Sequence, residues 1–100
     1  MAWTIYTVGS DRREALDAAL KDDVVSRQSQ KVRDGPSVGA PSGTTIVLVE
    51  GTSAALERLG QLLGGVGTRL QGDDAERLYR KLKDEEEAAS AGMGLFFTEG

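Results

Sequence analysis

The chain has 100 residues, of which 39% are hydrophobic and 28% are charged. This length fits one domain spanning residues 1–100, and the composition is too apolar for an intrinsically disordered protein. The sequence contains no His, no Cys and no Asn. It therefore lacks the residues for disulfides, thiol nucleophiles, imidazole acid–base catalysis and conventional zinc, copper, haem or iron–sulfur sites. We expect neither a metal nor a cofactor.

Charge and hydropathy limit the possible partners. The 12 basic and 16 acidic residues give a net charge of -4, which argues against binding to nucleic acid or to an anionic membrane surface. The longest aliphatic run is Ile46–Val49, far shorter than the roughly 20 residues of a membrane span. The N-terminus has neither the basic nor the apolar region of a signal peptide. We expect a cytoplasmic protein without a membrane partner.

The first part of the chain predicts a strand, a helix and a second strand. Trp3–Val8 is rich in β-branched and aromatic residues, which favours a strand. A helix is expected over Asp11–Lys21, where Asp11 and Glu14 have the spacing of a capping box. Val24–Arg33 begins with two β-branched residues but is polar on both alternating faces. Such a strand suits the edge of a sheet, where charged side chains discourage pairing with other chains.

A flexible Gly/Pro/Ser loop between two strands is expected over residues 34–43. The next segment, Thr44–Glu50, carries the strongest strand pattern in the chain. Its aliphatic residues, Ile46–Val49, alternate so that both faces of the strand are apolar. We therefore expect both faces of the sheet to be covered at this strand.

The second half predicts two helices and two further strands. A helix capped by Thr52 or Ser53 has leucines and alanines at helical spacing. A short strand is expected over Val66–Gln71. The longest helix is expected over residues 73–91, and a final strand over Leu95–Thr98.

This order of elements predicts an α+β fold. The βαββα(β) order matches the ferredoxin-like sheet-and-helix sandwich, here with an extra C-terminal helix and strand. Helices cover only one sheet face in that plan, so the two-sided strand needs a second cover. Either the long third helix or a second copy of the chain covers it, and we favour self-association.

One motif resembles a catalytic sequence but lacks its chemistry. Gly35–Gly39 matches the G-x-S-x-G pattern of a nucleophile elbow. That chemistry needs a helix after the motif and a His that accepts the serine proton. The chain has no His, and a strand is expected next. We therefore interpret the segment as a loop and assign no catalytic residue.

Five residues are candidates for binding an anionic ligand. Ser10, Arg12 and Arg13 lie at the start of the first helix, where free amides and guanidinium groups together suit an anion. Arg27 and Lys31 belong to a stretch with no acidic residue and are weaker candidates. The alternative for all of these residues is an ordinary solvated surface.

The sequence leaves three functions open. The first is a non-enzymatic module that self-associates or docks on a protein partner as an accessory or regulatory subunit. It is motivated by the two-sided strand and by the small and apolar residues of Glu85–Phe97. The alternative is a sensor of a small anionic metabolite or nucleotide. A second alternative is a small enzyme that uses carboxylates, Lys or Tyr79, which requires a pocket that holds two or more of them.

Overall fold

The computed structural model describes the backbone of residues 2–99 and the side chains of residues 2–85. Strands, α-helices and short 3-10 helices (η) follow one another along this part of the chain. In order they are β1 (Ala2–Gly9), η1 (Ser10–Arg12), α1 (Arg13–Leu20), η2 (Val25–Arg27), β2 (Ser29–Asp34), η3 (Gly35–Val38), β3 (Thr44–Gly51), α2 (Ser53–Leu62), β4 (Gly67–Arg69) and α3 (Gly72–Glu99).

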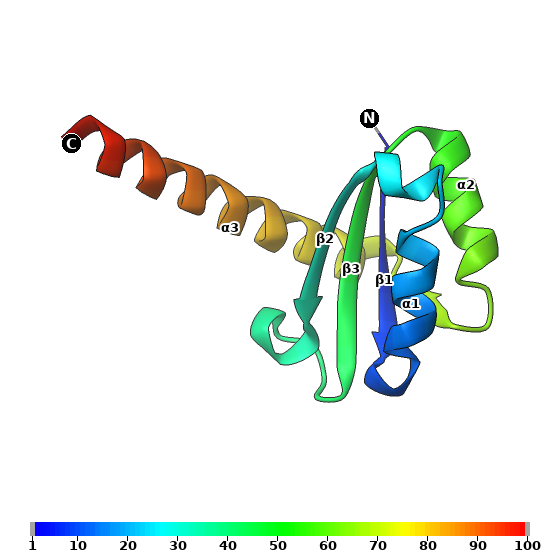
Figure 1. Cartoon of the computed structure of the whole chain (residues 1–100). Helices are drawn as coiled ribbons and strands as arrows, with labels where there is room; N and C mark the ends of the chain where they lie inside the picture. Colours follow the sequence, from blue (N-terminus) through cyan, green and yellow to red (C-terminus); the bar gives the residue numbers. More distant parts are fainter. Residues whose placement is uncertain (1, 100) are drawn as a thin grey trace.

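The described strands form one antiparallel sheet of four strands in the order β2-β3-β1-β4 (Figure 1). The central strands β1 and β3 pair along their whole length, from Ala2 opposite Gly51 to Gly9 opposite Thr44. Among the described strands, β2 pairs only with β3, and β4 pairs only with β1. The prediction that the polar strand lies at a sheet edge is therefore confirmed for β2. The described chain is a small α+β protein with three α-helices.

The helices α1 and α2 cover one face of the sheet. Tyr6 and Val8 of β1 lie on this face beside Val47 and Val49 of β3, as the pairing register requires. These side chains form one buried cluster with residues of α1, η2 and α2 and with the residue that directly follows α2. The residues that these segments contribute are Leu16, Ala19, Val25, Leu59 and Leu63.

The helix α3 covers the opposite face (Figure 1). Ile5, Ile46 and Leu48 form a second buried cluster with Leu82 of α3, and Val38 of η3 completes it. Ile46 and its neighbours in β3 are therefore buried on both sides of the strand, as the sequence predicts. In the described residues the cover on this face is α3, so the apolar face does not require a second copy of the chain.

The first helix begins later than the sequence predicts. Ser10–Arg12 form the 3-10 turn η1, and α1 begins at Arg13. No side chain caps either element, so the expected capping box of Asp11 and Glu14 does not form. The carboxylate of Asp11 instead lies over Gly9, where an added Cβ would be 2.6 Å from Oδ1. A tight turn out of β1 thus replaces the first turn of the predicted helix.

Val24–Arg33 is not one continuous strand. Val25–Arg27 form η2, and β2 begins only at Ser29. The amide of Val25 donates a hydrogen bond to the carboxylate of Asp22, and its side chain is fully buried. A capped turn that buries a valine under the sheet outweighs the weak local strand preference of β-branched residues.

The connection over residues 34–43 joins β2 to β3, as predicted, and contains η3. This short helix buries Val38 in the cluster beneath α3. Gly39 and Gly43 each have a φ of 80°, in the left-handed region that favours glycine, and this lets the chain reverse direction. The flexibility of this segment stays a prediction.

The predicted final strand is wrong. Leu95–Thr98 lies within the bounds of α3, which continues to Glu99. An isolated four-residue strand gains few hydrogen bonds, whereas each residue added to an existing helix adds one bond. The side chains of residues 86–99 lie outside the described part of the structure. β4, at Gly67–Arg69, is also shorter than the strand expected over Val66–Gln71.

Removing the side chain of Leu82 tests whether α3 closes the sheet. We expect Leu82→Ala to lower the free energy of unfolding by about 2–5 kcal/mol, because it leaves a cavity against Ile46 and Leu48. Lys81→Ala is the matched control, since Lys81 is exposed on the same helix, and it should change stability by less than about 0.5 kcal/mol. Equal effects of the two substitutions in urea unfolding would contradict packing of α3 on the sheet.

Candidate functional site

Three connections meet at the end of the sheet where the first predicted ligand residues lie. The amide of Ser10 donates to the carbonyl of Gly43 at 2.8 Å. Nη1 of Arg12 donates to the carbonyl of Gly65 at 3.2 Å. The β1–α1 turn is thus held to the β2–β3 connection and to the turn before β4. An anion bound here would compete with these two hydrogen bonds.

The other predicted ligand residues lie in different places. Nε of Arg13 pairs with Asp17 at 3.1 Å on α1. Arg27 lies in η2, beyond the opposite end of α1, and pairs with Asp23 at 3.4 Å on the open surface. Lys31 lies on β2, on the sheet face that α3 covers. The structure brings Ser10, Arg12 and Arg13 into one region but separates them from Arg27 and Lys31. Ligand binding by either group stays a prediction.

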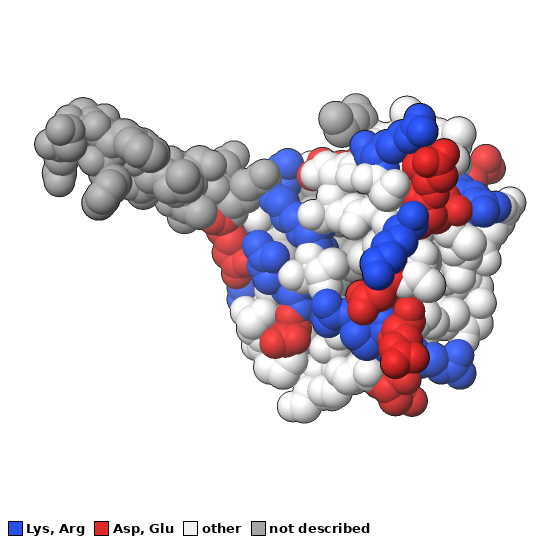
Figure 2. Space-filling model, in the orientation of Figure 1, with Lys and Arg blue, Asp and Glu red and all other residues white. Residues whose placement is uncertain are grey.

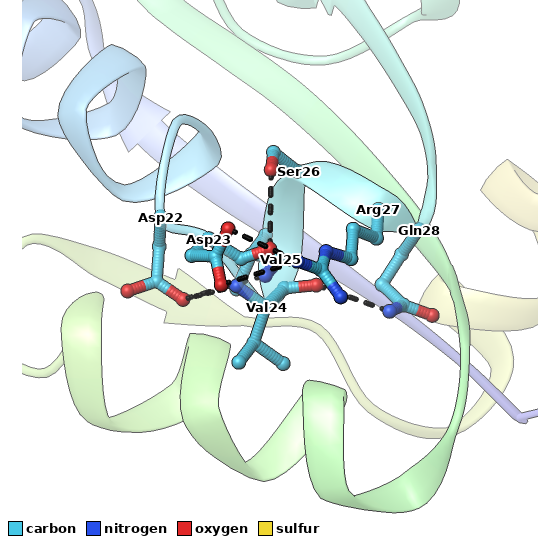
Figure 3. A network of polar contacts seen from close by, with 7 residues as sticks. All are labelled: Asp22, Asp23, Val24, Val25, Ser26, Arg27 and Gln28. Atoms are coloured by element: carbon cyan, nitrogen blue, oxygen red, sulfur yellow. Dashed lines mark hydrogen bonds and ion pairs between the residues drawn. The ribbon is translucent and has the colours of Figure 1, made fainter.

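Asp22 organises the turn that precedes β2 (Figure 3). Its Oδ2 accepts hydrogen bonds from the amides of Val24 at 3.1 Å and Val25 at 3.3 Å. Its Oδ1 accepts from Nη2 of Arg58 at 2.9 Å and from Nε at 3.3 Å. The bond from Arg58 is the largest cause that lowers the pKa of Asp22 below its ordinary value of 3.8, although partial burial opposes it. One carboxylate therefore links the end of α1, η2 and α2.

A polar and aromatic cluster fastens α3 to the sheet. Oε2 of Glu50 accepts a hydrogen bond from the hydroxyl of Tyr79 at 3.1 Å, and Oε1 accepts one from Nζ of Lys83 at 3.0 Å. The ring of Tyr79 stacks on Trp3 with centroids 4.3 Å apart and an interplanar angle of 15°. The side chain of Glu50 is only 12% exposed. Its two donors, Tyr79 and Lys83, both belong to α3. This cluster contains groups that the enzyme hypothesis requires.

The geometry of this cluster suits anchoring better than catalysis. The principal hollows lined by described residues do not include Glu50, Tyr79 or Lys83. A general acid or base must reach a substrate atom within hydrogen-bond distance, and these groups instead reach one another. No group of three or more potential metal-ligating side chains occurs among the described residues.

A different hollow, of about 260 Å³, lies between α2 and the β1–β4 edge of the sheet. Thr4 and Tyr6 of β1, Arg69 at the end of β4, and Glu57 and Gly60 of α2 contribute to its lining. Sequence reasoning missed this site because its residues come from three segments. These segments come together because β4 pairs with β1. The sequence of a three-residue strand does not indicate which strand it pairs with.

The surface charges are mixed in sign. Figure 2 shows basic and acidic side chains interspersed over α1 and its neighbours on the face that is drawn. Nucleic-acid recognition needs a continuous basic face, and this face does not provide one. Among the described residues, no helix is both long enough and apolar enough to cross a membrane.

The Asp22–Arg58 contact predicts a specific pH dependence. The folded pKa of Asp22 lies below 3.8, so its contribution to stability is present above that value and is lost as the pH falls through the folded pKa. We expect Asp22→Asn to be less stable than the natural chain at neutral pH, with the difference shrinking below pH 3.8. Urea unfolding across this range measures the difference.

Asp23→Asn is the control for this prediction. Its carboxylate meets Arg27 with the two side chains 86% and 73% exposed, and exposed pairs contribute little to stability. If the two substitutions gave the same pH profile, Asp22 would have no special role in the turn.

Comparisons of this chain with models of protein families, with curated proteins and with solved structures found no match.

Proposed function

We propose that this chain is a non-enzymatic cytoplasmic module that associates with a second copy of itself, and that the contact is the distal half of α3, defined as residues 86–99. In this proposal the module serves as an accessory or regulatory subunit of a larger assembly. Mixed surface charge and the absence of His and Cys from the sequence agree with a role that rests on protein contacts.

The proposal includes the ferredoxin-like plan for the part of the chain before α3. In the split βαβ arrangement, β3 inserts between the parallel strands β1 and β2, and β1 inserts between β3 and β4. The order β2-β3-β1-β4 with antiparallel neighbours supports this plan. Both crossover helices, α1 and α2, pack on the same sheet face, which supports it further. The helix α3 is then an addition that covers the second face.

The mismatch between the length of α3 and the width of the sheet carries the association proposal. α3 has 28 residues, so it is about 42 Å long at a rise of about 1.5 Å per residue. Four strands about 4.8 Å apart give a sheet roughly 15–20 Å wide. The contacts of α3 with the sheet among the described side chains reach Glu85, whose Oε2 lies 3.8 Å from Nε of Arg33 in the edge strand β2. Figure 1 shows α3 continuing past this edge.

The sequence of the distal half supports a helical partner. Small residues that permit close approach of two helices are followed by large apolar residues, namely Ala88, Ala89, Ala91, Gly92, Leu95, Phe96 and Phe97. An apolar helical segment gains stability by packing against another element, since helices of this length are marginal alone. The acidic run Glu85–Glu87 precedes this segment. We expect an antiparallel pair, which keeps the two acidic runs apart.

The anion-sensor alternative at Ser10, Arg12 and Arg13 has less geometric support. The amide of Ser10 and the guanidinium of Arg12 already donate to backbone carbonyls. For the enzyme alternative, the described residues offer the cluster at Glu50, whose groups hydrogen-bond to one another.

Sedimentation velocity over a range of concentrations tests the association proposal. We expect the full chain to sediment as a dimer at high concentration, and a variant with Leu95→Gln, Phe96→Ser and Phe97→Ser to sediment as a monomer. Loss of an apolar helix contact weakens association at the interface where it is buried. Lys81→Gln, on the exposed side of the sheet-covering part of α3, should leave the dimer intact.

Circular dichroism at a concentration low enough for all three proteins to be monomers must show the same thermal unfolding of the domain, so that loss of dimer is not loss of fold. A full chain that stays monomeric at every concentration would overturn the proposal. So would a dimer that survives the triple substitution.

A further inference from the structure

The sheet has a gap along the edge of β1. β4 pairs only with the segment from Tyr6 to Val8, and the last backbone contact along this edge is the amide of Leu70 donating to the carbonyl of Ile5 at 2.9 Å. The chain then turns away at Gly72 into α3. Within the described part of the chain, the start of β1 therefore has no strand beside it on this side. The hollow of about 260 Å³ lies at this gap, on the side of α2.

The lining of the hollow contains a buried hydroxyl without a partner. Thr4 lies opposite Val49 in the register, which places its side chain on the α2 face of the sheet. The residue is only 5% exposed, and its Oγ1 is buried without a hydrogen-bond partner. Buried hydroxyls are normally satisfied, because leaving one unpaired destabilises the fold. Because this oxygen has almost no accessible surface, a ligand in the hollow can complete it only after the side chain of Thr4 turns to another rotamer.

A second hydroxyl faces the same space. Tyr6 is largely buried, and a Cβ added at Gly60 of α2 would lie 3.3 Å from its hydroxyl oxygen. Gly60 thus keeps the side of α2 open where the hydroxyl of Tyr6 ends. A larger residue at this helical position would narrow the hollow.

Two opposite charges line the hollow without meeting each other. Among the described residues, the side chains of Arg69 and Glu57 take part in no hydrogen bond or ion pair. Both residues contribute to the lining, and both are exposed. A guanidinium binds a carboxylate by paired N–H···O bonds, and a carboxylate binds an ammonium group. A ligand that carries both charges would satisfy both sides, whereas Glu57 would repel a simple anion.

We propose that this hollow binds a free α-amino acid. Arg69 holds the ligand carboxylate, Glu57 holds the ammonium group, and the hydroxyls of Thr4 and Tyr6 donate or accept hydrogen bonds at the base. Leu56 supplies an apolar wall for the ligand side chain. The volume lies below the roughly 300–1,000 Å³ typical of sites for drug-sized ligands, which suits a small metabolite better than a nucleotide.

Amide chemical-shift perturbation on the full chain tests this proposal. Each proteinogenic L-amino acid is added separately at about 10 mM, a concentration that detects millimolar affinity. We expect at least one amino acid to shift the amides of Thr4, Gly60 and Arg69 together. L-lactate, which lacks the amine of L-alanine, and ethylamine, which lacks the carboxylate, are the matched control probes.

Four variants assign the roles. Arg69→Gln should weaken binding by about tenfold or more, because it removes the charged partner of the carboxylate. Glu57→Gln should weaken binding of the amino acid but not of lactate. Thr4→Val is isosteric and should weaken binding while leaving the ligand-free protein no less stable. Gly60→Ala should weaken binding, because the added methyl group narrows the hollow beside Tyr6, and should keep the fold, since alanine favours a helix.

Several results would overturn the proposal. One is the absence of shifts with any amino acid. A second is undiminished binding in Arg69→Gln, and a third is tighter binding in Glu57→Gln, which would indicate a plain anion site. Undiminished binding in Gly60→Ala would place the ligand in the separate hollow that Thr4 and Arg69 also line on the α3 side. The inference is independent of self-association, so the variant substituted at residues 95–97 should bind equally well.

Discussion

The architecture depends on the central strand β3, which has no polar face between Ile46 and Val49. Each of these four residues is at most 1% exposed. At about 25 cal/mol per Å² of buried apolar surface, neither face can be left to water without losing a large part of the stability of a small domain. The helices α1 and α2 satisfy one face, and α3 satisfies the other. The same requirement fixes the register, because a slip by one residue would exchange the side chains between two differently shaped covers.

The position of α3 on the second sheet face depends on fewer buried apolar contacts than that of α1 and α2 on the first face, and more of its contacts are polar. Leu82 supplies a fully buried apolar contact, with the partly buried Leu78 beside it, whereas Glu50 fixes the helix through Tyr79 and Lys83. Apolar packing alone allows several angles between a helix and a sheet. A carboxylate on the sheet that accepts hydrogen bonds from two side chains of the helix allows a much narrower range of angles. The stack of Trp3 on Tyr79 adds a rigid contact at the start of β1. The direction in which α3 leaves the sheet past β2 follows from these contacts, and so does the placement of its distal half.

Elements with strong periodic patterns could be predicted from the sequence, and elements set by single polar contacts could not. Thr44–Glu50 and the helix with Thr52 or Ser53 as its cap were predicted because alternation and helical spacing report burial directly. Of the two candidate caps it is Thr52 whose Oγ1 accepts from the amide of Ala55. The turn at η2 was missed because one carboxylate, Asp22, overrides the local preference. For the candidate site, the predicted residues are spread over separate regions. Arg69 and Glu57 converge only through strand pairing that no local pattern encodes.

The structure depends on the cover of the second sheet face by α3 of the same chain. An isotope-filtered nuclear Overhauser experiment on a mixture of labelled and unlabelled chains tests it most directly, because it separates contacts within a chain from contacts between chains. We expect strong intramolecular effects between the rings of Trp3 and Tyr79, whose centroids are 4.3 Å apart, and between Leu82 and Leu48. The absence of these effects, or their appearance only between chains, would contradict it.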